Sequence, residues 1–303
     1  MSQIGKPPCD DALILHGGQA TPCAPASRRW VLAAAIIGSS LAFIDGTVVN
    51  VALPAIQRDL QADAFEAQWV VESYALFLAA LLLVGGSLGD HFGRRMMFAI
   101  GVVLFAAASV ACALSADVRQ LITARAVQGV GAALLVPGSL ALISASFPAR
   151  ERGRAIGTWS GFSGITAALG PVLGGFLVDH YSWPWAFLIN VPLAIVALAI
   201  TWLRVPESRG AATGGLDSWG ALLATVALGG IVYAFIEAPR QQWGSRAVLA
   251  ALLVGVAAAM VFVVVELRAR SPMLPLQLFR IRNFSGANLL TLLLYAALGG
   301  GLY

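Results

Sequence analysis

Asp45 is the residue whose type and position most strongly indicate chemistry. It lies fifteen residues past Trp30, inside an apolar run long enough to cross a membrane as a helix. At 1.5 Å per residue, that places it about 22 Å along the span. A carboxylate at such a depth is energetically costly and by default marks a proton or ion pathway, because it can take up and release a proton. The alternative is a structural hydrogen bond between two helices.

Two further charged residues fall inside apolar runs. Arg125 begins one of them, about one turn (~6 Å) below the membrane surface. From there its side chain could pair with Asp45 or extend to the outer lipid headgroups. Glu72 lies one turn into another run, at a depth that interfacial water reaches, and is a weaker candidate. We therefore predict that Asp45, Arg125 and Glu72 couple protons to substrate.

A glycine-rich segment occurs twice in the chain. Residues 85–92 and 174–181, which are 89 residues apart, both have the pattern Gly-Gly-x-Leu-x-Asp-His-aromatic. That interval fits three membrane helices, and an odd number puts the second copy on the opposite side of the bilayer. This pattern indicates an inverted-topology repeat, typical of secondary transporters, in which spans one and four occupy equivalent places. Asp45 and Arg125 lie on those two spans and are expected to be neighbours.

The first copy predicts a tight hairpin, closed by glycines, between two spans. Its Asp90 would accept a helix N-terminus or an arginine from another bundle, so the hairpin would act as a conformational latch. The alternative is a loop that only sets the topology. The residues of the predicted latch are Gly86, Asp90, Gly93, Arg94 and Arg95, with Gly89 as a second turn residue.

The second copy ends a span that carries no charge but many glycines. Small residues allow helices to approach closely, and a proline inside a span bends it. The segment therefore predicts either plain helix packing or control of the tilt between two conformations. Its residues are Gly161, Gly170, Pro171, Gly174 and Gly175.

Composition identifies a membrane protein. Hydrophobic residues make up 59% of the 303 residues and charged residues 11%, whereas a soluble domain carries roughly 25% charged residues. Of the nineteen Lys and Arg residues, fourteen fall in the N-terminal tail or the even-numbered loops. The positive-inside rule then places the N-terminus in the cytoplasm. Arginines spread over short loops do not form a nucleic-acid-binding face, so no nucleic acid partner is expected.

Nine apolar stretches are long enough to span the hydrocarbon core as helices. We expect a tail at 1–29, a six-helix bundle at 30–203, a cytoplasmic linker at 204–217, two extra helices at 218–265, and a loop with the start of a second bundle at 266–303. The final stretch stops without a polar tail, so the sequence is expected to be a fragment. The nine stretches are Trp30–Leu53, Trp69–Leu88, Met96–Ser115, Leu121–Phe147, Ala155–Val178, Trp183–Leu203, Ser218–Ile236, Ala247–Val265 and Phe284–Tyr303.

Enzyme signatures are missing from the sequence. It has no His-Glu-x-x-His, no Gly-x-Ser-x-Gly and no Walker-type phosphate loop, so neither catalysis nor ATP drive is expected. The three cysteines lack metal-ligand spacing. We expect no metal and no cofactor, with a proton gradient as the driving force.

Four segments together resemble the major facilitator superfamily, and within it the fourteen-span drug:proton antiporters. They are 45–54, similar to that branch's first-helix motif; 86–95, similar to the loop between spans two and three; 125–133, similar to the span-four motif linked to proton transfer; and 161–175, similar to the span-five antiporter motif. One departure is Trp183-Pro184-Trp185, where the branch usually has Trp-Arg-Trp.

The resemblance implies an all-α polytopic membrane protein, a helix bundle with three-plus-three inverted repeats of which about nine transmembrane helices are present. It further implies a proton-coupled antiporter that exports small organic compounds across the cytoplasmic membrane by alternating access. Its partners would be the lipid bilayer, an organic substrate and protons; the sequence does not indicate an oligomeric state. The alternatives are a specific metabolite transporter of the same fold, or a truncated membrane protein that does not transport.

Overall fold

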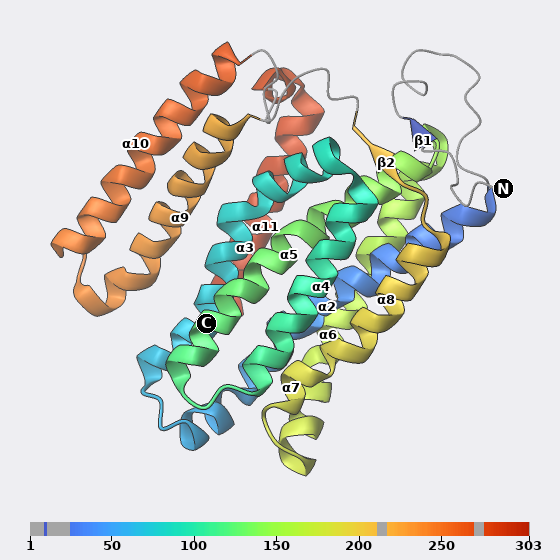
Figure 1. Cartoon of the computed structure of the whole chain (residues 1–303). Helices are drawn as coiled ribbons and strands as arrows, with labels where there is room; N and C mark the ends of the chain where they lie inside the picture. Colours follow the sequence, from blue (N-terminus) through green and yellow to red (C-terminus); the bar gives the residue numbers. More distant parts are fainter. Residues whose placement is uncertain (1–8, 11–24, 211–216, 270–275, 303) are drawn as a thin grey trace.

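The computed structural model describes residues 9–10, 25–210, 217–269 and 276–302 (Figure 1). Nearly all of them are helical, as the apolar composition requires, because a helix satisfies its backbone hydrogen bonds internally within a bilayer. The helices are α2 (Pro25–Asp59), α3 (Ala64–Phe92), α4 (Arg94–Ala113), α5 (Val118–Ser146), α6 (Ala149–His180), α7 (Trp185–Leu188), α8 (Asn190–Arg204), α9 (Ser218–Gln241), α10 (Arg246–Arg268) and α11 (Arg282–Leu302), with a 3₁₀ turn η1 at Leu276–Arg280.

Aspartates begin three of the long helices, because a carboxylate satisfies the free N–H groups of a first turn. Asp63 and Glu66 form a reciprocal capping box at the start of α3. The side chain of Asp117 accepts from the backbone N–H of Gln120 at the start of α5. Asp217 does the same for Gly220 at the start of α9. These caps fix where the helices begin, and therefore which side chains point into the bundle.

The bundle that contains the site comprises α2–α8. Its closest pairs are α3 with α5, α4 with α5 and α2 with α6, and α8 packs against α2 and α4. Backbones approach closely where glycine leaves room: a Cβ on Gly85 would lie 1.9 Å from the Ala133 carbonyl oxygen, and one on Gly129 would lie 2.5 Å from that of Tyr74. Both contacts join α3 to α5, and so hold the Arg125 helix against the bundle.

Helices α9 and α10 form a separate hairpin beside α3 (Figure 1). The indole N–H of Trp69 donates to Glu237 Oε1 at 3.0 Å across the α3–α9 contact. Farther along, Ala80 Cβ lies near Gly229. The expected pair of extra helices at 218–265 therefore corresponds to α9 and α10, which end a few residues beyond that range.

Eight segments of the described residues are long and apolar enough to span a membrane. Most begin and end a few residues beyond the ranges expected from the sequence; α2, for example, reaches Asp59 and contains Pro54. The sixth span is broken, because α7 and α8 are separated at Ile189. The expected ninth span coincides with α11, whose last side chains lie outside the described residues.

The N-terminal tail is described only in part. Cys9–Asp10 forms strand β1, which pairs in parallel with strand β2, Ser208–Arg209. These two tail residues therefore have regular structure. The rest of the tail up to residue 24, like much of the linker at 211–216, lies outside the described residues.

Candidate functional site

Asp45 and Arg125 form a fully buried ion pair at the centre of the bundle. Arg125 Nη1 lies 2.5 Å from Asp45 Oδ2, and the two side chains are 1% and 0% exposed. The structure thus joins the two residues that the inverted repeat predicted to be neighbours. It also excludes the alternative in which Arg125 extends to the outer headgroups.

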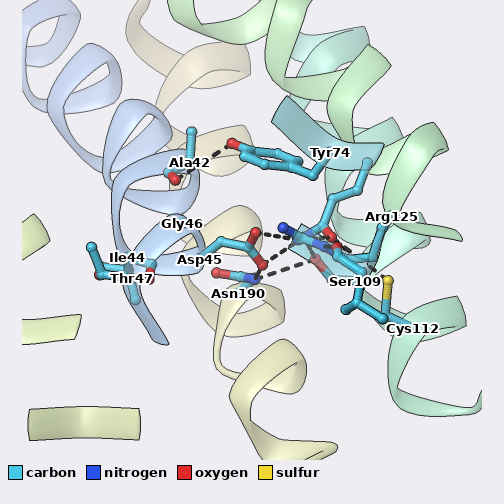
Figure 2. A network of polar contacts seen from close by, with 12 residues as sticks. Ala42, Ile44, Asp45, Gly46, Thr47, Tyr74, Ser109, Cys112, Arg125 and Asn190 are labelled. Carbon is cyan, nitrogen blue, oxygen red and sulfur yellow. Dashed lines mark hydrogen bonds and ion pairs between the residues drawn. The ribbon is translucent and has the colours of Figure 1, made fainter. Parts of the chain in front are cut away.

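Side-chain amides complete the network around the carboxylate (Figure 2). Asp45 Oδ1 accepts from Gln128 Nε2 at 2.8 Å and from Asn190 Nδ2 at 3.0 Å. Both amides also donate to Ser109 Oγ, at 2.9 and 3.3 Å. The carboxylate, which is on α2, therefore has three donors: two from α5 and one from α8. The sequence analysis did not predict Gln128, Asn190 or Ser109; one available signal was that Gln128 follows Arg125 by three residues, on the same helix face.

Arg125 is held from several sides. Its Nε donates to the backbone carbonyl of Val70 at 3.0 Å, and its Nη1 also donates to Gln128 Oε1 at 2.7 Å. The Tyr74 ring stacks on the guanidinium, with 4.3 Å from Cζ to the ring centroid, and Phe187 contributes a second ring at 5.8 Å. A desolvated arginine is stabilised by aromatic faces as well as by its counterion. Helices α2, α3, α4, α5, α7 and α8 thus all contribute to one site.

The glycines of α6 in the segment 161–175, which resembles the antiporter motif, divide into two groups. A Cβ on Gly170 would lie 1.8 Å from Thr47 Oγ1, and one on Gly174 would lie 3.1 Å from the Val48 carbonyl oxygen. Both glycines therefore let α6 pack against α2 within one turn of Asp45. Gly161 and Gly175 have no described atom within 4 Å of an added Cβ, so among the described residues they are not in close helix contact. Pro171 lies inside α6, which is continuous through it.

The predicted latch is a junction of one residue. Helix α3 continues through Gly89 and Asp90 to Phe92, and only Gly93, at φ +119°, breaks the helix before α4 begins. Gly89 is therefore helical, and the expectation that it helps to close a turn is wrong. Asp90 Oδ1 accepts from Arg94 Nε at 2.8 Å, so this carboxylate oxygen is already bonded by a residue of the same junction. Gly86 lies on α3, where an added Cβ would be 3.8 Å from Pro137 Cβ.

The segment that follows α8 also binds this junction. Glu207 Oε1 accepts from the Arg95 backbone N–H at 2.9 Å, and Arg95 Nη1 donates to the Val205 carbonyl at 3.2 Å. The backbone N–H of Gly210 donates to the Asp90 carbonyl at 3.0 Å. The first residues of the linker therefore cover the latch.

Glu72 lies outside the buried network. It is half-buried on α3, and within the described part of the chain it has no hydrogen-bond or ion-pair partner. Two grooves, of about 930 Å³ between α4 and α5 and about 350 Å³ between α3 and α9, are lined by other residues. The Asp45 network is thus a buried centre, and none of its residues lines these two grooves.

A family model described as Major Facilitator Superfamily matches residues 35–303. The chain belongs to the major facilitator superfamily. This membership fits the helical bundle and the two glycine-rich copies already described.

Several curated proteins with similar sequences are named resistance proteins. The chain is 41% identical over 250 residues to the multidrug resistance protein Stp of Mycobacterium tuberculosis (strain CDC 1551 / Oshkosh), covering 82% of this chain and 47% of that protein. It is 37% identical over 278 residues to the tetracenomycin C resistance and export protein of Streptomyces glaucescens, covering 91% and 52%. The chain thus spans about half the length of these relatives.

Solved structures show the same fold. The crystal structure of the peptide transporter POT in complex with sulfate superposes with a TM-score of 0.57 at 17% identity, covering 83% of this chain and 54% of that one. At that identity the likeness shows the fold alone. The chain is thus a multi-pass membrane protein of a transporter superfamily.

Proposed function

We propose that this protein is a proton-coupled antiporter that exports small organic compounds across the cytoplasmic membrane by alternating access. The observation that carries the proposal is the buried Asp45–Arg125 pair. A carboxylate at 0% exposure with an arginine counterion and two amides is a group that one proton can change from ion pair to neutral acid. The names of the resistance relatives support export as the direction.

In this proposal Asp45 binds the proton and Arg125 couples the change to the helices. Arg125 contacts α2 through Asp45 and α3 through Val70 and Tyr74. When Asp45 becomes neutral, the guanidinium loses its counterion, and the contact between α2 and α5 weakens. The two helices belong to different three-helix repeats, so this is a contact whose strength can bias movement between the repeats.

The latch and Glu72 have separate roles in the proposal. Asp90 and Arg94, at the α3–α4 junction, stabilise one of the two conformations of the transport cycle. Glu72, half-buried and unpaired among the described residues, contacts the substrate. The variant Glu72→Gln is then expected to change the substrate concentration for half-maximal efflux and to leave the dependence on the pH gradient intact.

The test is transport of a panel of organic cations and neutral drugs in everted membrane vesicles, where export from the cell is measured as uptake into the vesicle, driven by an imposed pH gradient. The variant Asp45→Asn is expected to abolish gradient-driven efflux while it inserts into the membrane normally. Asp179→Asn, which changes an exposed carboxylate near the end of α6, is the matched control and should transport as the unmodified protein does. Unimpaired efflux in Asp45→Asn would remove Asp45 from the mechanism, and transport of a single metabolite from a wide panel would favour a specific transporter.

The charge distribution leads us to infer a cytoplasmic N-terminus. A protease-cleavable tag before Met1 should be cut in everted vesicles and protected in intact cells. The reverse pattern would invert the topology.

A further inference from the structure

The amide of Asn190 presents a buried oxygen with no partner. Asn190 is 0% exposed and begins α8. Its Nδ2 donates to Asp45 Oδ1 and to Ser109 Oγ, whereas its Oδ1 is buried without a hydrogen bond among the described residues. A buried acceptor left unsatisfied is destabilising, and each case in a native structure calls for an explanation.

Gln128, the other amide on Asp45, is fixed in its orientation. Its Oε1 accepts from Arg125 Nη1 at 2.7 Å, with Cys112 Sγ at 3.6 Å on the same oxygen. Turning this amide over would place its NH₂ group against the guanidinium, donor against donor. Asn190 has no such restraint, because no donor is bound to its oxygen. Of the two amides, only Asn190 has no contact with the guanidinium, so once Asp45 is neutral it can exchange its ends without losing a contact to a charge.

We propose that Asn190 is a positioning residue whose amide turns over to serve both protonation states of Asp45. The inference rests on the proposed function, because it assumes that Asp45 takes up a proton. With Asp45 ionised, Nδ2 donates to the carboxylate, as the structure shows. With Asp45 protonated, the amide rotates about its Cβ–Cγ bond, and Asn190 Oδ1 accepts the new carboxyl O–H. The amide oxygen and nitrogen are nearly equal in size, so the exchange needs no extra space.

The carboxyl oxygen that receives the proton follows from the surrounding charges. The titratable groups that face Asp45 are Arg125 from α5, Tyr74 from α3 and Cys112 from α4; α8 contributes the neutral Asn190. The guanidinium donates to Oδ2, which leaves Oδ1, the oxygen that faces the two amides, for the proton. The proton comes from water and bonds to Oδ1, and no other bond forms or breaks.

Ser109 supports the second state as well as the first. Its Oγ accepts from Gln128 and Asn190, and the described residues include no acceptor for its own proton. After the Asn190 amide turns, the Ser109 hydroxyl faces Asn190 Oδ1 in place of the NH₂ group and donates to that oxygen. In each state the end of the amide that faces Asp45 and Ser109 is then hydrogen-bonded, and the Asn190 oxygen that is unpaired now gains two donors.

Infrared difference spectroscopy of the reconstituted protein tests the inference without any substitution. Acidification is expected to produce the carbonyl band of a protonated carboxyl group. In protein labelled with ¹³C-asparagine it should also remove an unpaired amide carbonyl band and produce a hydrogen-bonded one at lower frequency. Asp45→Asn should remove both changes. A carboxyl band that depends on Asp45 without any asparagine change would overturn the inference and leave the proposed function standing. Absence of any Asp45-dependent carboxyl band would overturn both.

The pH profile of efflux supplies a second test with a different result for the rival explanation. In Asn190→Leu the ionised carboxylate loses the Nδ2 donor and the protonated carboxyl loses the Oδ1 acceptor of Asn190. The two losses offset each other, so the midpoint of the pH profile should stay close to that of the unmodified protein. Removal of an amide that only donates to the ionised carboxylate would instead move the midpoint to higher pH, by roughly one unit for one buried hydrogen bond, and that result would overturn the inference. Asn50→Leu, an exposed asparagine on the same helix as Asp45, is the matched control and should leave the midpoint unchanged.

Discussion

Removal of Arg125 should destabilise the unmodified protein more than it destabilises the Asp45→Asn variant. Arg125→Met leaves the Asp45 carboxylate at 0% exposure with only Gln128 and Asn190 as donors. Breaking a buried pair in this way costs about 3–5 kcal/mol, because one charge is left uncompensated. In an Asp45→Asn background, the same substitution removes only the hydrogen bonds to Val70 and Gln128 and the stacking on Tyr74, which we expect to cost about 1–2 kcal/mol.

The difference between these two costs is the coupling energy of the pair, about 2–3 kcal/mol. The assay is unfolding in mixed micelles by titration with SDS, for the two single variants, the double variant and the unmodified protein. The destabilisation of Arg125→Met should also become smaller as the pH falls, because the orphaned carboxyl can then take up a proton. Additive effects of the two substitutions, or a destabilisation independent of pH, would refute the reasoning that Asp45 is an ionised partner of Arg125.

Three further predictions concern the contacts around the site. Gly170→Ala places a methyl group against α2 and should lower stability by about 1–3 kcal/mol and slow efflux, while Gly175→Ala, with open space around it, should change neither. Gly93→Ala forces a side chain into a left-handed backbone conformation and against the carboxylate of the linker, so protease cleavage near this junction should become faster. Trp69→Phe removes the donor to Glu237, so amide hydrogen exchange in α9 should rise while that in α5 stays unchanged.

The charged centre could be predicted from the sequence, because charge in an apolar run is rare and the repeat relates the two helices. Asp45 and Arg125 are conspicuous by type, and the 89-residue interval relates spans one and four. The repeat places these two spans in equivalent positions, so a pair between the two residues is expected. The structure decides between that pair and the alternative in which Arg125 extends to the headgroups.

The neutral members of the network could not be predicted, because their role depends on rotation about each helix axis. Each residue turns a helix by about 100°, so a shift of one position decides whether a side chain faces the centre or the lipid. Gln128 faces Asp45, whereas Glu72, one turn into its span, does not. Asn190 lies at the start of α8, on the side of the sixth span that faces Asp45, and the hydropathy pattern gives no signal of that orientation.

The same limit explains the errors among the glycines. An added Cβ on Gly85, but not one on its neighbour Gly86, would contact the backbone of α5. One on Gly170 would contact α2, whereas one on Gly161 has no described atom within 4 Å. Spacing identifies a span rich in small residues, but the face on which the partner helix lies is set by the packing of the whole bundle. The junction at Gly93 was likewise placed correctly, but its extent was overestimated, because α3 continues as a helix to Phe92.

Helix α3 is attached at both ends to the part of the chain that follows α8. At one end the linker binds the Gly93 junction through Glu207, and at the other end Trp69 binds Glu237 of α9. A helix that is hydrogen-bonded near both ends to neighbouring segments cannot tilt relative to them without losing one of those hydrogen bonds. The linker and the extra hairpin of α9 and α10 therefore restrain α3 at its two ends, and a tilt of α3 away from them has to break at least one of these hydrogen bonds.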